Sequence, residues 1–159
     1  MTEPSTISIE RVRRIGPRPV APRVSTFTRP FWDALAAGRL ISTHCRQCGR
    51  VSFPPKPLCR SCWSEDIDWI DLPSNGTLYS FTRVHVVPRA FLSDALYDIG
   101  IVDLPNGVRL MCRLLDAGPG TEVGSAVRMV SAIYDDGPLF AARVEPSPSA
   151  SPLLARDPP

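Results

Sequence analysis

The sequence lacks a run of about 18 or more apolar residues, so it offers no candidate for a membrane-spanning helix. Its first residues include Arg11, Arg13 and Arg14 without the apolar stretch that would follow in a secretory signal. A glycine-rich phosphate loop is also missing. We therefore expect a cytoplasmic protein that associates with no membrane and uses no phosphate loop.

The chain also lacks an even number of cysteines, since it has five. This odd count and the missing export signal argue against a secreted disulfide framework and favour metal binding or free thiols. The length of 159 residues, with 43% hydrophobic and 21% charged residues, is typical of one globular domain or two very small ones. A wholly disordered chain is not expected.

Proline, by contrast, is abundant, with 18 residues that gather toward both ends of the chain. Residues 1–30 lack an apolar period and hold six arginines against Glu3 and Glu10, so we interpret them as a flexible, basic, proline-rich arm. Residues 146–159 are expected to form a disordered Pro/Ser tail. The region between these ends has no excess of basic residues, which argues against a strongly basic nucleic-acid-binding core.

A short helix of about two turns is predicted for residues 31–42. Phe31 and Leu35 fall on one helical face, and Gly38 is a natural C-terminal stop. Phe31 and Trp32 have two interpretations: they cover the adjacent module, or they dock on a partner protein.

Residues 43–72 contain the strongest motif of the sequence, C-x2-C-x10-C-x2-C. Its members are Cys45, Cys48, Cys59 and Cys62. Two intervening residues let both thiolates of one turn face a single ion, and two such pairs supply the tetrahedral soft ligands that suit zinc. Four thiolates leave no coordination position for water, so we expect a structural Zn²⁺ that performs no catalysis. Iron in a rubredoxin-like site and redox-active C-x-x-C motifs are the alternatives.

The residue that follows each cysteine pair differs. Gly49 follows the first pair, where a residue able to adopt a positive φ lets backbone amides turn toward the sulfurs. Trp63 follows the second pair, which lacks that glycine.

Residues 73–145 are mainly β, with short alternating segments between turn residues and no convincing helix. The expected strands are residues 77–87, 97–104, 108–115, 126–133 and 139–144. Asn106-Gly107 is the strongest hairpin signal. An open five-stranded sheet would expose its edges, so we expect closure into a five-stranded OB-fold barrel, with an SH3-like barrel as the alternative.

No self-contained active site is recognisable. Cys112 lies in an alternating strand, where a lone cysteine is more often a core residue than a nucleophile. His85 has no serine, cysteine or aspartate partner at motif spacing, and His44 is interpreted as an ordinary strand residue. Asp135 and Asp136 are expected to form a solvated turn.

The order of these parts carries a family resemblance. It rests on Phe31-Trp32-Asp33-Ala34-Leu35, His44-Cys45-Arg46-Gln47-Cys48-Gly49 with the following Phe53-Pro54-Pro55, Cys59 to Cys62, Gly76-Thr77-Leu78-Tyr79-Ser80 and Gly124-Ser125-Ala126-Val127. On these residues the chain, from about Phe31 to Val144, resembles the family called domain of unknown function 35 (DUF35). The resemblance implies an N-terminal helix, a rubredoxin-like zinc ribbon and a C-terminal OB-fold.

The same resemblance implies a function. Members of this family are small partners of acyl-CoA enzymes, so we expect a non-catalytic accessory subunit that helps to hold an acyl-CoA substrate against a thiolase-fold partner. The partner would be an acyltransferase, a thiolase or synthase, or an aldolase, joined with this chain in a hetero-oligomer.

The loop at residues 88–95 is long for a hairpin and supplies candidate contacts. Phe91 and Leu92 suit a protein interface or an acyl chain, while Arg83 and Arg89 suit the phosphates of CoA. The alternative is that Phe91 and Leu92 only cap the end of the barrel.

A competing function is binding of single-stranded nucleic acid, because zinc ribbons and OB-folds both serve it. Such a surface needs aromatic platforms interleaved with basic residues. Tyr79 and Phe81 share a strand face, but few basic residues lie near them in the sequence. Accessory binding of acyl-CoA is therefore the favoured hypothesis, and an iron-based electron carrier is a third.

Overall fold

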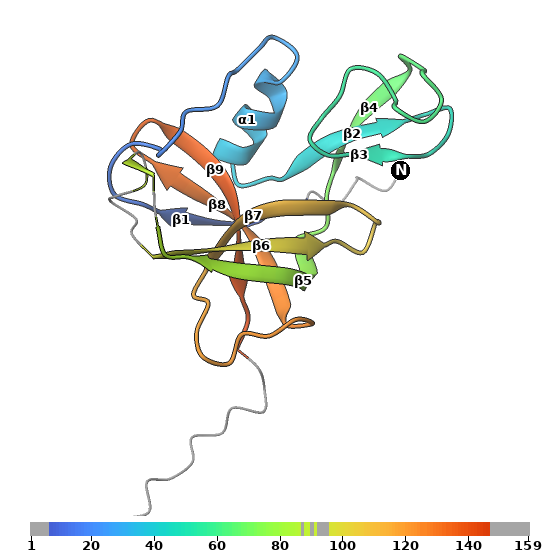
Figure 1. Ribbon diagram of the computed structural model, residues 1–159. Helices are drawn as coiled ribbons and strands as arrows, with labels where there is room; N and C mark the ends of the chain where they lie inside the picture. Colours follow the sequence, from blue (N-terminus) through green and yellow to red (C-terminus); the bar gives the residue numbers. More distant parts are fainter. Residues whose placement is uncertain (1–6, 87, 90, 92–95, 147–159) are drawn as a thin grey trace, which may run out of the picture.

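The computed structural model describes residues 7–86, 88, 89, 91 and 96–146. It combines one helix, a three-stranded sheet and a barrel (Figure 1). The elements are β1 (Glu10–Arg13), α1 (Arg29–Ala36), β2 (Ile41–Cys45), β3 (Val51–Ser52), β4 (Ile67–Asp71), β5 (Asn75–Val84), β6 (Tyr97–Asp103), β7 (Arg109–Leu115), β8 (Ala126–Tyr134) and β9 (Gly137–Val144). Among the described residues, no helix is long and apolar enough to cross a membrane.

The barrel is closed by five strands, as the sequence predicts. Neighbouring strands follow the order β5-β6-β7-β9-β8, and β8 returns to β5 through the pairs Asn75–Arg128 to Thr77–Ala126. All pairs in this ring are antiparallel except β7 with β9, which is parallel. Alternate residues point inward, so that in β6 every second side chain is buried. The interior contains Leu78, Val102, Leu110, Val127 and Met129.

Helix α1 and the small sheet lie on the same side of the barrel (Figure 1). A cluster of aromatic rings joins the three parts: the ring centroid of Phe31 lies 6.1 Å from that of Phe53 and 6.2 Å from that of Phe140. The Ser131 hydroxyl donates a buried hydrogen bond of 2.7 Å to the Leu35 carbonyl. The helix ends at Ala36, earlier than the expected residue 42, because the chain turns at Gly38 and then enters β2. At Gly38 φ is +80°, and an added Cβ would lie 3.0 Å from the Ile9 carbonyl oxygen.

These contacts decide between the two interpretations of Phe31 and Trp32. Phe31 is only 4% exposed and belongs to the main core. Trp32 packs edge-on against it, with ring centroids 4.9 Å apart, and is partly buried. The docking interpretation is wrong for Phe31, whose ring is covered by this chain itself.

The N-terminal segment differs most from the sequence-based expectation of a flexible arm. Strand β1 pairs in parallel with β8 from Glu10–Val130 to Arg13–Ile133. The Arg13 guanidinium donates to Asp135, and Arg18 binds Asp136 with its backbone amide at 2.7 Å. No local sequence pattern predicts this order, because the partners of β1 and of these two arginines lie more than a hundred residues away in the chain.

Candidate metal centre and ligand pocket

The small sheet presents four cysteines at one end. Cys45 ends β2, Cys48 lies in the turn that follows, and Cys59 and Cys62 lie in the loop between β3 and β4. Their four sulfur atoms all lie within 4.8 Å of one another. Across the two turns, Cys45 Sγ is 3.5 Å from Cys62 Sγ, and Cys48 Sγ is 3.5 Å from Cys59 Sγ.

This geometry fits a tetrahedral metal. With metal–sulfur bonds of about 2.3 Å, the sulfurs of a zinc tetrathiolate lie about 3.8 Å apart, close to the separations found here. The backbone amide of Ser61 points at Cys59 Sγ from 3.4 Å. Hydrogen bonds from the amides of Cys62 and Ser61 lower the pKa of the Cys59 thiol to about 6, which favours the thiolate form that a metal needs.

The two cysteine turns have the same backbone shape. The amide of Gly49 donates to the Cys45 carbonyl, and the amide of Trp63 donates to the Cys59 carbonyl, both at 2.9 Å. Gly49 has φ of +72° and Trp63 has φ of +61°, so a bulky residue adopts the left-handed conformation in the second turn. Together the turns supply four thiolates, which is a closed ligand set for a structural ion.

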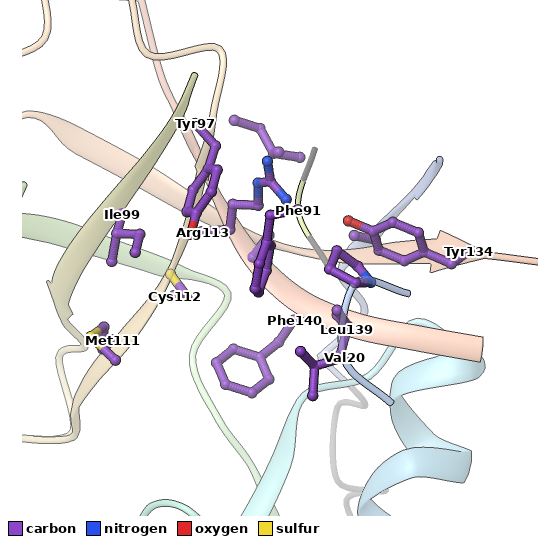
Figure 2. Close-up of a pocket in the computed structure, with 14 residues that line it drawn as sticks. Val20, Phe91, Tyr97, Ile99, Met111, Cys112, Arg113, Tyr134, Leu139 and Phe140 are labelled. Carbon is purple, nitrogen blue, oxygen red and sulfur yellow. The ribbon is translucent and has the colours of Figure 1, made fainter. Parts of the chain in front are cut away.

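A separate apolar cavity of about 270 Å³ lies against β6, β7 and β9. Phe91, from the loop between β5 and β6, forms one wall, and the N-terminal arm contributes Pro19 and Val20. In Figure 2 the Phe91 ring lies between Tyr97 and Tyr134 and points toward Phe140. Other lining residues are Ile99, Met111, Cys112, Arg113, Leu115, Ala132, Leu139 and Ala141.

Two aromatic rings and a guanidinium group pack together at the mouth of this pocket. The ring centroid of Phe91 lies 5.4 Å from that of Tyr97. The Arg113 guanidinium lies over the same Tyr97 ring, 4.4 Å from its centroid. Met111 is 67% exposed, so the apolar lining continues onto the surface of the barrel. The pocket is therefore open at the side of β7 and suits an elongated apolar group.

The candidate residues from the sequence do not all meet in this pocket. Phe91 lines it, while Arg89 is exposed and is not among the lining residues. Arg83 instead binds both Asp98 carboxylate oxygens, with Nε 2.9 Å from Oδ1 and Nη2 3.1 Å from Oδ2. Leu92 lies outside the described residues.

The other pocket residues were not predicted, although the sequence carries a signal for two of them. Ile99 and Met111 are apolar residues on the outward face of strands whose inward face is also apolar. A strand with apolar side chains on both faces indicates that something covers the outer face. Val20 had no such signal, because it reaches the pocket only through the arm.

The remaining residues singled out from the sequence do not assemble a catalytic pair. Burial raises the pKa of the Cys112 thiol to about 12, which agrees with the core interpretation. In the part of the chain that the structure describes, His44 and His85 share no hydrogen bond with a serine, a cysteine or a carboxylate. Asp135 and Asp136 do not form the merely solvated turn that was expected, since they hold the arm through Arg13 and Arg18.

Two family models match the chain in succession. Residues 32–68 match the model described as "ChsH2, rubredoxin-like zinc ribbon domain", and residues 69–131 match "ChsH2, C-terminal OB-fold domain". The small sheet is thus a zinc ribbon and the barrel an OB-fold, which confirms the predicted fold class. The zinc-ribbon match and the four clustered sulfurs together support Zn²⁺ as a structural ion.

Several curated proteins are similar to this chain. A DUF35 domain-containing scaffold protein of Methanocaldococcus jannaschii is 33% identical over 104 residues, which cover 62% of this chain and 74% of that protein. The benzoylsuccinyl-CoA thiolase subunit BbsA of Thauera aromatica is 32% identical over 128 residues, covering 76% and 87%. The 3-oxo-4,17-pregnadiene-20-carboxyl-CoA hydratase alpha subunit of Mycobacterium tuberculosis is 30% identical, but the match covers only 39% of its length.

A solved structure shows the same architecture. A chain of an Ltp2-ChsH2(DUF35) aldolase superposes with a TM-score of 0.69 at 26% identity, and the match covers 78% of this chain and 98% of that one. The zinc ribbon and the barrel therefore occur together in a chain found within an enzyme assembly.

Proposed function

This chain belongs to the DUF35 family, and from that premise we propose that it is a non-catalytic accessory subunit of an acyl-CoA-processing complex. Its partner would be a thiolase-like enzyme: an acyltransferase, a thiolase or synthase, or an aldolase. The names of its relatives support this, since they include a thiolase subunit, a hydratase subunit and an aldolase assembly. In this proposal the partner supplies the chemistry.

The observation that carries the proposal is the position of the apolar pocket. OB-folds bind their ligands on the face of the second and third barrel strands, between the loops that follow the first and fourth strands. Here those strands are β6 and β7, the first loop supplies Phe91, and Tyr134 precedes the second loop. The pocket thus occupies the ligand-binding face of the fold.

The chemistry of the pocket suits the acyl part of a thioester. Its walls are mostly aliphatic and aromatic, and each methylene of a ligand buried there would contribute about 0.8 kcal/mol. The Phe91 ring would cover the acyl chain at the mouth of the pocket. Arg89 is exposed and lies two residues before Phe91, and Arg83 binds Asp98 through Nε and Nη2. Both arginines are proposed to meet the phosphates of CoA, Arg83 through Nη1, for which no hydrogen bond is found among the described residues.

The zinc centre has a different role in this proposal. Cys45, Cys48, Cys59 and Cys62 would hold the ion, whose contribution is to cross-link the two cysteine turns. Because the ligand set is closed, substrate would not reach the metal. The ion holds the ribbon rigid beside the ligand-binding face.

The decisive experiment is co-purification of the tagged full-length chain from its native host, with the retained proteins identified by mass spectrometry. We expect a thiolase-fold, aldolase or acyltransferase subunit in stoichiometric amount. Retention of single-stranded nucleic acid with strongly salt-dependent binding would instead support the competing function, for which the stacking of Arg109 over Tyr79 at 3.5 Å is the favourable observation. In that case the acyl-CoA proposal is wrong.

Calorimetric titration with acyl-CoA tests the pocket directly. We expect affinity to rise with acyl-chain length and free CoA to bind more weakly than any acyl-CoA. Equal affinity for CoA and acyl-CoA would show that the apolar pocket does not receive the acyl chain.

A further inference from the structure

The two ends of the apolar pocket are formed by different parts of the chain. Figure 2 shows Ile99 and Met111 at one end and Val20 at the other, with Phe91 and Phe140 between them. Met111 is 67% exposed, so the pocket opens to the surface at its own end. The N-terminal arm therefore lies at the end opposite this opening.

The arm is held in place on both sides of Val20. Before it, Arg18 donates to Asp136 through its backbone amide at 2.7 Å, and its guanidinium lies 3.3 Å from the same carboxylate. After it, the ring centroid of Phe27 lies 5.5 Å from that of Trp69. The segment that contains Val20 is thus attached to the barrel at one end and to the zinc ribbon at the other.

The composition of this segment also suits a wall. Pro17, Pro19 and Pro22 lie within six residues of the arm, and each proline ring fixes its own φ. Fixed dihedral angles reduce the entropy that is lost when the segment is ordered. Val20 is 60% exposed and belongs to neither hydrophobic core cluster, so its side chain contributes little to the folding of the barrel.

The size of the pocket gives this wall a consequence. The cavity measures about 270 Å³, whereas a cavity of about 150 Å³ is enough for one benzene ring. The pocket therefore has room for less than two such rings, which corresponds to fewer than about twelve carbon atoms. An acyl chain that enters beside Met111 and exceeds this size meets the arm at Val20.

We propose that Val20 forms the end wall of the acyl pocket and restricts this chain to CoA thioesters of short and medium-length acyl groups. This inference rests on the proposed function, because the ligand is the acyl group assigned to the same pocket. In this arrangement Val20 determines the length of the acyl group, and Arg18 positions Val20 through Asp136.

Calorimetric titration of the zinc-loaded full-length chain with straight-chain acyl-CoAs, from butyryl-CoA to tetradecanoyl-CoA and below their micelle concentrations, tests this role. For the wild-type chain we expect the affinity to rise about fourfold per added methylene and to level off before about twelve carbons. Val20→Phe narrows the pocket, so it should lower the affinity for dodecanoyl-CoA at least about tenfold and leave that for butyryl-CoA unchanged. Val20→Ala removes two methyl groups and should let the rise continue to a longer chain.

Val24→Phe is the matched control. Val24 lies on the same arm, is 42% exposed and does not line the pocket, so this variant should keep the wild-type dependence on chain length. The unfolding temperature and the hydrogen exchange of β1 are measured for every variant. A role of Val20 in holding the arm would change these two quantities and weaken the binding of all acyl-CoAs alike.

The possible failures are distinguishable. A wild-type affinity that keeps rising through tetradecanoyl-CoA shows that the pocket has no end wall, and an unchanged dependence on chain length in both Val20 variants shows that Val20 is not that wall. In both cases the proposed function stands. Equal loss of affinity at every chain length assigns Val20 a structural role. If the wild-type chain binds no acyl-CoA more tightly than free CoA, the proposed acyl pocket and this inference are both wrong.

Discussion

At Gly76 the barrel permits no side chain. A Cβ there would lie 2.7 Å from Val102 Cγ1 and 2.8 Å from the Asp103 carbonyl oxygen, so the β5–β6 backbones would have to separate. We expect Gly76→Ala to lower the free energy of unfolding by about 1–3 kcal/mol, the usual cost of overpacking. Denaturant titration measures the change. Gly118→Ala, where an added Cβ meets open space, is the control and should change stability by less than about 0.5 kcal/mol.

Cys112 differs from the other four cysteines in being a core thiol. Its pKa, raised to about 12 by burial, keeps the thiol protonated at pH 8, and only the thiolate reacts quickly with iodoacetamide. We expect no alkylation of Cys112 at pH 8 in the native zinc-loaded protein and full alkylation after denaturation, as read by mass spectrometry. Rapid labelling of the native protein would place Cys112 on an accessible surface.

The roles of some residues could be predicted from the local sequence, whereas the roles of others could not. The cysteine spacing identified Cys45, Cys48, Cys59 and Cys62 because both turns are local and bring their sulfurs together without help from the rest of the fold. The roles of Phe31 and Asp136 depend on partners distant in the chain, namely Phe140 and Arg18. Local pattern cannot distinguish a core aromatic residue from a docking residue when the covering element lies a hundred residues away.

The side chain of Arg18 helps to attach the N-terminal arm to the barrel. Arg18 lies across Gly137, with Nη1 2.8 Å from where a Cβ would stand, and donates through Nη2 to the Asp136 carbonyl at 2.7 Å. Arg18→Ala is expected to speed amide hydrogen exchange in β1 about fivefold, because the arm opens more often. Arg23→Ala, an exposed arginine on the same arm, should leave the exchange unchanged.

The same contact makes the arm sensitive to acid. A hydrogen bond from the Arg18 amide, together with its guanidinium, lowers the pKa of Asp136 below the usual 3.8. A lowered pKa means that the attachment is complete above pH 3.8 and weakens as pH falls through the lower folded-state value. Hydrogen exchange of β1 should therefore accelerate, beyond its intrinsic pH dependence, only below pH 3.8, and acceleration near neutral pH would contradict this assignment.

The zinc ribbon depends on its ion because β2, β3 and β4 are short. We expect one zinc per chain, and we expect Cys48→Ser or a strong chelator to abolish metal binding and unfold the ribbon, because the ion no longer cross-links the two cysteine turns. Metal analysis and amide chemical-shift dispersion measure this. Cys112→Ala should retain the full zinc content, and a metal-free Cys48→Ser chain that keeps its ribbon signals would show that the ion is dispensable.

Among the secondary-structure elements, the barrel strands were easier to predict from the sequence than strand β1. The alternation in β6 to β9 is strong enough to give their ends within a few residues. Strand β1 has two arginines and a glutamate among its four residues and no apolar period, and it becomes a strand only because the edge of β8 offers it hydrogen bonds. Edge pairing of this kind is determined by tertiary structure and leaves no trace in local composition.

In the whole molecule, the four cysteines of the metal site lie in the zinc ribbon, whereas the apolar pocket lies on the barrel. The ring centroids of Phe53 from the ribbon loop and Phe140 from β9 lie 5.2 Å apart, so the ribbon is packed directly on the barrel. Ribbon and pocket thus have a fixed relation, and a partner that holds the ribbon also positions the pocket. This arrangement suits a subunit that presents a ligand to another protein.

We predict that this chain alone does not convert acyl-CoA. The zinc set is closed, Cys112 is protonated, and neither histidine is paired with a nucleophile in the described part of the chain. The purified zinc-loaded chain should therefore bind acyl-CoA and return it unchanged, as followed by mass spectrometry, whereas addition of the co-purifying enzyme should start its consumption. The assay uses this chain purified free of that enzyme, and the heat-denatured chain is the control. Consumption that increases with the concentration of this chain alone would make it an enzyme in its own right.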